Sequence, residues 1–158
     1  MTLEEEVVSL LKKYQYTITT AESCTGGLIA GTLINVPGVS SFLKEAYITY
    51  SDEAKEKLLG VKKEIIDEFT VVSAETAEAM AVGGANAANT DICISATGIA
   101  GPDGGSKEQP VGLVYLGCFC KGHVRTRRFV YDGDRQLVRK LAVKEALLFI
   151  KEMILDED

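Results

Sequence analysis

The fold of this chain is organised around the stretch Thr17-Ile18-Thr19-Thr20-Ala21-Glu22-Ser23-Cys24-Thr25-Gly26-Gly27. Its β-branched beginning is typical of a strand. After the glycine pair the pattern becomes helical, because the apolar residues between positions 28 and 34 share one face. A strand that turns directly into a helix presents side chains at the sheet edge, beside unpaired helix N–H groups. That geometry suits a nucleophile, an oxyanion or a phosphate.

The hydroxyl and thiol groups of this turn also have structural interpretations. Ser23 or Thr25 could serve only as the N-cap of the following helix, and capping hydroxyls are far commoner than nucleophiles. The stretch alone therefore favours capping. Cys24 is a rival nucleophile, because a helix N-terminus lowers the pKa of a thiol, and its alternative is a small buried thiol.

Composition limits the class of protein. A chain of 158 residues with 46% apolar and 25% charged residues fits one globular domain with a full core. No apolar run approaches the roughly 20 residues of a membrane span, and the acidic N-terminus is unlike a secretory signal, so we expect a cytoplasmic protein without membrane contact. A net charge of −6 argues against nucleic acid as the main partner, but it leaves room for a small anionic ligand.

The four cysteines do not form a disulfide or metal pattern. Cys118 and Cys120 share one side of an expected strand, so they are poorly placed to bond to each other. No CxxC spacing supports a metal site with the single histidine, His123. We expect reduced thiols, with Cys93 and Cys118 in the core, no metal and no cofactor.

The order of the elements predicts an α/β fold. Helices are expected at residues 3–14, 28–35, 51–60, 62–69 and 74–88 and from residue 133 onward. Strands are expected at residues 17–20, 46–50, 91–96, 111–120 and 123–131, and Lys121-Gly122 forms a hairpin turn between the last two. One domain, residues 1–158, is predicted. Its architecture is a three-layer α/β/α sandwich on a mixed, mostly parallel sheet of about five strands, with a C-terminal hairpin and a closing helix.

Several chemically capable side chains fall at the carboxyl ends of the expected strands, where open α/β sheets bind ligands. These are Ser23, Tyr50 and Thr97-Gly98, and Lys55 lies just over one helical turn beyond Tyr50. A serine nucleophile needs a base, and His123 lies beside a hairpin turn. A desolvated lysine can replace histidine, as in Ser-Lys hydrolases, while the tyrosine could relay a proton or fix the serine. Taken singly, the lysine also fits a solvated helix residue and the tyrosine a packed aromatic.

A glycine-rich loop follows the expected central strand, with the sequence Thr97-Gly98-Ile99-Ala100-Gly101-Pro102-Asp103-Gly104-Gly105-Ser106. It matches neither GxGxxG nor the P-loop, so classical dinucleotide or ATP binding is not supported. Its N–H groups could bind an oxyanion or a phosphate. Arg135 opens the last helix, where dipole and guanidinium could hold an anion together. An ordinary long turn and a surface arginine are the alternatives.

Five blocks in this order resemble the CinA C-terminal domain family, namely residues 20–27, 49–55, 98–105, 110–112 and 133–135. The resemblance runs from about Thr17 to Ile150. It implies a metal-independent nicotinamide-nucleotide amidohydrolase of pyridine-nucleotide salvage that acts on nicotinamide mononucleotide and forms homo-oligomers, dimers or higher. In longer relatives this domain follows one similar to molybdopterin-binding proteins, so we expect a stand-alone form here.

The resemblance also assigns roles to residues. It implies that Ser23 is the nucleophile, Lys55 the base and Tyr50 an assisting residue. Asp52 stands where many relatives have asparagine, and its charge would favour the protonated form of the lysine. The expected substrate-binding residues, which would hold the oxyanion and the phosphate, are Thr25, Gly26, Gly27, Thr97, Gly98, Gly101 and Arg135.

Two other functions fit the same sequence. One is a nucleotide-sensing module that binds without hydrolysis and needs no competent Ser-Lys pair. The other is an amidohydrolase that uses Cys24 as its nucleophile.

Overall fold

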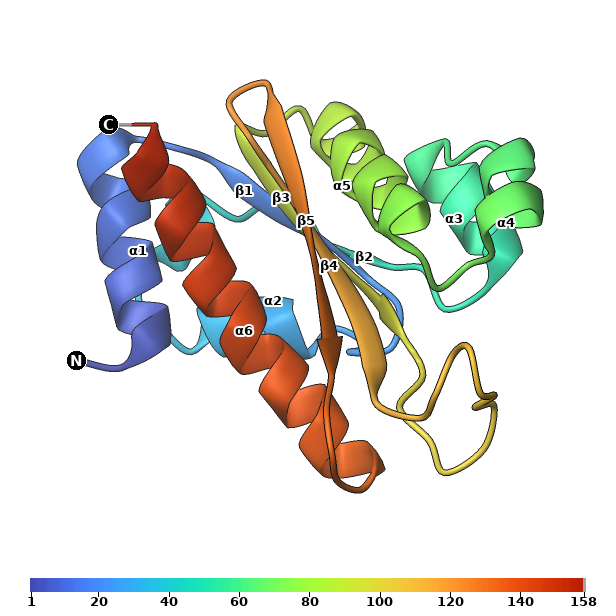
Figure 1. Ribbon diagram of the computed structural model, residues 1–158. Coiled ribbons are helices and arrows are strands. Elements are labelled where there is room, and N and C mark those ends of the chain that lie inside the picture. Colours follow the sequence, from blue (N-terminus) through green and yellow to red (C-terminus); the bar gives the residue numbers. More distant parts are fainter. Residues whose placement is uncertain (158) are drawn as a thin grey trace.

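A five-stranded mixed sheet forms the middle layer of the computed structural model, which describes residues 1–157 (Figure 1). The strand order is β2-β1-β3-β4-β5. The strands are β1 (Ile18–Glu22), β2 (Tyr47–Ile48), β3 (Ile92–Gly98), β4 (Leu113–Cys120) and β5 (His123–Val130). β1 runs parallel to β2 and β3, whereas β4 runs antiparallel to β3 and β5. The predicted α/β sandwich is confirmed, and its parallel pairing lies in the β2-β1-β3 half.

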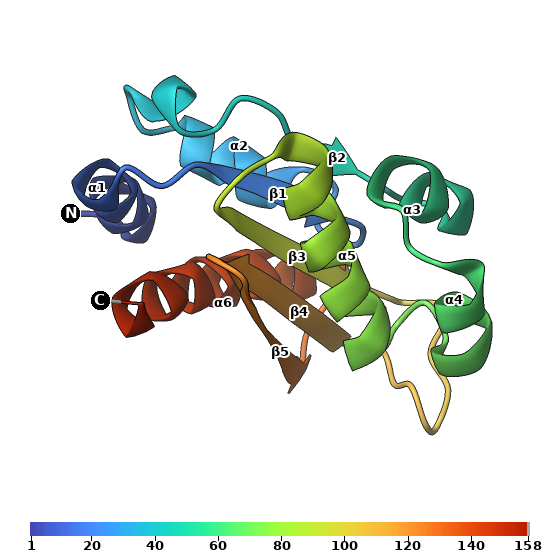
Figure 2. The same cartoon turned by 90° about the horizontal axis from the view of Figure 1, so that it is seen from above.

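Helices cover both faces of this sheet (Figures 1 and 2). One face carries α1 (Leu3–Tyr14), α2 (Leu28–Ile34) and α6 (Arg135–Asp156). The other carries α5 (Ala74–Ala88), beside which lie α3 (Asp52–Leu59) and α4 (Lys63–Phe69). The short 3₁₀ helix η1 (Val39–Ser41) lies between α2 and β2 in the chain. None of the helices within residues 1–157 combines the length and apolarity needed to span a bilayer.

The hydrophobic core is split by the sheet into two parts. The larger part lies under α1, α2 and α6 and includes Leu11, Ile92 and Phe149. The smaller part lies under α5 and includes Met80 and Cys93. All residues of β3 before Gly98 are buried, as expected for a central strand covered on both faces.

Local sequence signals explain most element boundaries. Ser51 and Ser73 cap α3 and α5, because their hydroxyls accept the backbone N–H groups of Ala54 and Thr76. The predicted hairpin turn is present, with Lys121 and Gly122 at φ values of 49° and 89°. Cys120 and His123 pair directly across it.

The strands differ from the expected bounds at the end of the sheet where the site lies. β3 continues past Ala96 to Gly98, β4 begins at Leu113 and β5 ends at Val130. β1 extends beyond its β-branched run to Glu22, because it pairs with β3 along its whole length. β2 is limited to Tyr47–Ile48, because this edge strand meets β1 only at the two pairs Ala21↔Tyr47 and Glu22↔Ile48. Residues 49 and 50 are therefore loop, and they lead directly into α3.

Candidate active site

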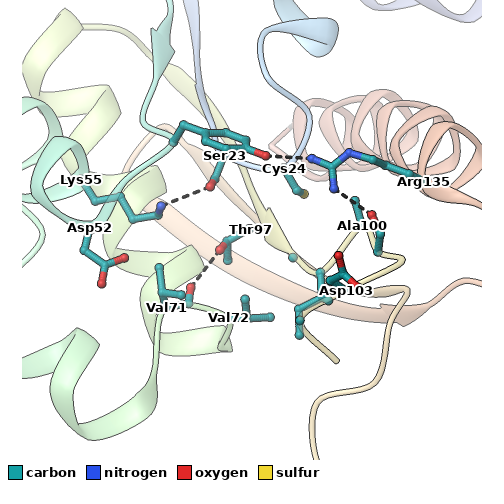
Figure 3. A pocket seen from close by; sticks show the side chains of 15 residues that line it. Ser23, Cys24, Asp52, Lys55, Val71, Val72, Thr97, Ala100, Asp103 and Arg135 are labelled. Atoms are coloured by element: carbon teal, nitrogen blue, oxygen red, sulfur yellow. Dashed lines mark hydrogen bonds between the residues drawn. The ribbon is translucent and has the colours of Figure 1, made fainter. Parts of the chain in front are cut away.

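A pocket of about 320 Å³ opens where the carboxyl ends of β1 and β3 meet the N-termini of α3 and α6 (Figure 3). Its lining contains all three expected catalytic residues and four of the expected binding residues: Ser23, Tyr50, Lys55, Thr97, Gly98, Gly101 and Arg135. The strand order brings these segments together, since β1 lies between β2 and β3. Ligand binding at this edge is typical of open α/β sheets.

Lys55 and Ser23 form the chemical centre of the pocket. The Lys55 Nζ lies 3.1 Å from Ser23 Oγ and donates to the Thr49 carbonyl at 2.9 Å. Lys55 extends from α3 into the fold and is only 1% exposed. This burial lowers the pKa of Lys55, while the charge of Asp52 acts in the opposite direction. Because the Thr49 carbonyl only accepts, it takes one amine N–H, and the lone pair of a neutral Lys55 can face the serine hydroxyl.

The turn after β1 is built around Glu22, which sequence reasoning did not single out. Its buried carboxylate accepts from Thr20 Oγ1 at 2.9 Å, Thr25 Oγ1 at 2.7 Å, Ile29 N at 2.9 Å and Ala30 N at 3.0 Å. Two of these donors are free N–H groups of the first turn of α2. The sequence signal that could have identified Glu22 is a glutamate at the end of a strand expected to be buried, because a glutamate is rarely fully buried unless its carboxylate has partners.

The capping prediction for Ser23 and Thr25 is wrong. The N-cap of α2 is Gly27, which has a φ of 97° and no capping side chain. Thr25 instead donates to Glu22, and the Ser23 backbone N–H donates to the Ala96 carbonyl of β3 at 2.9 Å. Glu22 performs the task expected of a capping hydroxyl, so the side chain of Ser23 remains available to the pocket.

Three of the expected binding residues, Thr25, Gly26 and Gly27, lie outside the pocket lining. Arg139 of α6 binds the backbone of this part of the turn. Its Nε donates to the Cys24 carbonyl at 2.9 Å, and its second guanidinium contact is the Thr25 carbonyl at 3.1 Å. The structure therefore brings together the Ser23 side of the turn, Thr97 and Arg135, and directs Thr25 toward Glu22.

Tyr50 and Arg135 meet at the other side of the pocket. The Tyr50 hydroxyl accepts from Arg135 at 2.8 Å, and Arg135 also donates to the Gly101 carbonyl at 2.8 Å (Figure 3). Arg135 is the first residue of α6, whose N-cap is Asp134. The side chain of Tyr50 is exposed, so it forms part of the pocket mouth. A guanidinium at a helix N-terminus is well suited to an anionic group.

The wall formed by β3 and the glycine-rich loop is tied to the segment before α5. Thr97 Oγ1 donates to the Val71 carbonyl at 2.8 Å, and Gln109 Nε2 donates to the Val72 carbonyl at 2.7 Å. Gly98 cannot carry a side chain without moving its neighbours, because a Cβ there would lie 2.7 Å from the Leu113 carbonyl oxygen. The loop that lines the pocket is therefore anchored on both sides.

The alternative nucleophile and base are poorly suited to catalysis. Cys24 lines the pocket, but burial raises the pKa of its thiol to about 12, so the reactive thiolate is disfavoured near neutral pH. His123 lies at the β4–β5 hairpin, where its exposed ring is 3.8 Å from Glu157. The four cysteines are free, and Cys93 and Cys118 are buried as predicted; Cys24 and Cys120 are buried as well. Within residues 1–157, no group of three or more His, Cys, Asp or Glu side chains could hold a metal ion.

Comparison with known proteins gives consistent matches over the whole chain. A family model for the CinA C-terminal domain matches residues 1–154. A CinA-like protein from Kosmotoga olearia is 53% identical over 97% of this chain. The chain spans 37% of the length of that relative.

Solved structures agree with the match to the CinA C-terminal domain. A competence/damage inducible protein from Agrobacterium tumefaciens has a TM-score of 0.93 and 37% identity, with 96% of this chain and 93% of that chain covered. A CinA superfamily protein from Klebsiella pneumoniae has a TM-score of 0.93 and 32% identity, with 99% of each chain covered.

Proposed function

Because the chain belongs to the CinA C-terminal domain family, we propose that it hydrolyses the carboxamide of nicotinamide mononucleotide to nicotinic acid mononucleotide and ammonia. The observation that carries the proposal is the Ser23–Lys55 pair, with 3.1 Å between Oγ and Nζ and only 1% of the lysine exposed. A serine beside a desolvated lysine is the arrangement that a Ser-Lys amidase requires. The role in pyridine-nucleotide salvage belongs to the same proposal.

The proposed reaction proceeds through an acyl-enzyme. Neutral Lys55 takes the hydroxyl proton of Ser23 while Oγ attacks the carboxamide carbon. The ammonium of Lys55 then gives this proton to the departing nitrogen, and ammonia leaves. Water, deprotonated by the same lysine, attacks the ester, and the ammonium of Lys55 returns this proton to the departing Ser23 Oγ. The carboxylic acid that is formed loses its proton to solvent and is released as the carboxylate.

The remaining pocket residues suit the two anionic groups of this reaction. The N–H group of Gly98 is the better-positioned oxyanion donor, since Thr25 and Gly26 lie outside the lining and Thr97 is a hydrogen-bonded ladder partner of Tyr115 in β4. Arg135, bonded to Tyr50 and to the Gly101 carbonyl, is the proposed phosphate ligand. Tyr50 could then assist Ser23 once the phosphate has taken over the guanidinium.

Ammonia release in the presence of a chelator tests the proposal. Ser23→Ala should lower turnover by at least about a thousandfold, because the nucleophile is removed. Ser9→Ala, the same change on the exposed side of α1, should leave turnover unchanged. Full activity in Ser23→Ala would refute the assignment. Loss of activity in Cys24→Ser with retention in Ser23→Ala would transfer the role to the thiol.

One observation favours a second candidate, a module that binds the nucleotide without hydrolysing it. The charge of Asp52 raises the pKa of Lys55 and so lowers the fraction of neutral lysine that can act as the base. Stoichiometric binding of nicotinamide mononucleotide in calorimetry, without ammonia release by the wild type, would support this candidate.

We also propose a cytoplasmic homo-oligomer. Leu28, Ile34 and Ile48 are 41%, 58% and 55% exposed, and apolar residues of this kind are available for a subunit contact. Light scattering of the purified protein tests the oligomeric state, and a monomer at all concentrations would refute the proposed homo-oligomer.

A further inference from the structure

The pocket contains two carboxylates at different ends (Figure 3). Asp52 lies on the Lys55 side, where it is the first residue of α3, three positions before the lysine. Residues three apart on a helix are neighbours on its surface. Asp103 lies on the side of Ala100 and Arg135. The two acids therefore act on different parts of a bound molecule.

Hydrolysis of an amide changes charge at one end of the ligand only. The carboxamide is neutral, whereas the carboxylate that replaces it carries a full negative charge; ribose and phosphate stay the same. In the proposed function this changing group lies at Ser23 and Lys55. Burial disfavours the positive charge of Lys55 and the negative charge of Cys24, so neither side chain is suited to hold a product anion there.

We propose that Asp52 is a specificity-determining residue that disfavours the carboxylate product relative to the carboxamide substrate. Its negative charge repels the carboxylate formed beside it and leaves the neutral amide unaffected. The consequence is selective release of the product after each turnover. This inference rests on the proposed function, because it needs the changing group at the Ser23–Lys55 end.

Asp103 provides the matched comparison within the same pocket. It faces the Arg135 end, where substrate and product carry identical groups, so its charge changes both affinities by the same factor. Asp52→Asn and Asp103→Asn each remove one negative charge with little change of shape. Only the first should alter the ratio of the two affinities.

The measurement is calorimetry on the full chain carrying Ser23→Ala, which prevents turnover of the amide. Dissociation constants are determined for nicotinamide mononucleotide and nicotinic acid mononucleotide, alone and with Asp52→Asn or Asp103→Asn added. Coulomb repulsion between two unit charges in one partly solvated pocket predicts that Asp52→Asn lowers the acid-to-amide ratio of dissociation constants about three- to tenfold. Asp103→Asn should leave this ratio unchanged. In protein with Ser23 intact, Asp52→Asn should strengthen product inhibition by the same factor.

The outcomes separate this inference from the proposed function. An unchanged ratio with Asp52→Asn, or an equal fall with Asp103→Asn, overturns the inference, even if the wild type releases ammonia. A fall confined to Asp52→Asn supports the discrimination between the two ligands, and ammonia release by the wild type then tests hydrolysis separately. Failure of both ligands to bind overturns both proposals.

Discussion

Replacing Glu22 with glutamine should destabilise the fold while preserving the size of the side chain. The carboxylate oxygens accept four hydrogen bonds, two from the hydroxyls of Thr20 and Thr25 and two from the N–H groups of Ile29 and Ala30. An amide offers only one accepting oxygen, and its NH₂ group must then face the remaining two donors. If the amide nitrogen faces Thr20 and Ala30, the Thr20 hydroxyl can rotate and accept a hydrogen bond from it. The Ala30 N–H can only donate, so it loses its acceptor.

The expected magnitude follows from this count. One buried N–H without a partner costs about 1–3 kcal/mol. For a chain of this length, a loss of about 2 kcal/mol lowers the melting temperature by about 6 °C. Glu22→Ala leaves both α2 N–H groups unpaired and opens a cavity, so we expect a loss of about 3–6 kcal/mol.

Thermal and urea unfolding of the two variants beside the wild type would measure these losses. Glu68→Gln is the matched control, because this glutamate is exposed on α4 and the same change there should cost less than about 0.5 kcal/mol. Equal stability of Glu22→Gln and Glu68→Gln would refute the role given to Glu22. Equal losses in Glu22→Gln and Glu22→Ala would show that the number of unpaired donors does not determine the cost.

Three further predictions concern the base and the packing of its helix. Asp52→Asn should move the acid limb of the pH–rate profile to lower pH, because Asp52 raises the pKa of Lys55 and the base must be neutral; an unmoved limb would contradict this. The pKa of buried Lys55 is lower in the folded chain than in the unfolded chain, so between these two pKa values only the unfolded chain holds the proton. The free energy of unfolding of the wild type should therefore rise with pH in this range, by about 1.4 kcal/mol for each pH unit. Urea unfolding across pH should show this gain in the wild type and not in Lys55→Met. Gly83→Ala should destabilise the fold by several kcal/mol, because its Cβ would lie 1.9 Å from the Leu59 carbonyl oxygen at the end of α3. Gly31→Ala in α2 has open space around it and should stabilise the fold by about 0.5–1 kcal/mol. Thermal unfolding in which both variants gain stability would refute the packing argument.

Local elements of this fold could be predicted because their signals are local. Apolar spacing predicts α1, and a run rich in alanine and methionine predicts α5. Serines at positions 51 and 73 mark two helix starts. The Lys121-Gly122 pair predicts the hairpin because its backbone geometry depends on only two residues. The shortness of β2 could not be predicted, since an edge strand ends where its neighbour stops pairing.

The candidate site was accessible to sequence reasoning only in part. Ser23 and Lys55 could be proposed because serine and lysine near strand ends are chemically suggestive, and family resemblance supports their roles. The Tyr50–Arg135 bond joins residues 85 positions apart, and no local pattern predicts it. Glu22 was missed, and capping was wrongly expected of Ser23 or Thr25, because the choice among competing donors and acceptors depends on what is buried around them.

The sequence by itself therefore determined the element types, the order of helices and strands, the family and the chemically capable residues, since periodicity, turn chemistry and motifs are carried by near neighbours in the chain. Only the tertiary structure decided that β1 lies between β2 and β3, and hence that Lys55 reaches Ser23 across 32 positions. It also decided that this lysine is buried, which lowers its pKa, and that Asp52 and Asp103 occupy opposite ends of one pocket. The physical reason is that strand pairing, burial and electrostatic environment are properties of the packed chain as a whole, and no short segment contains them.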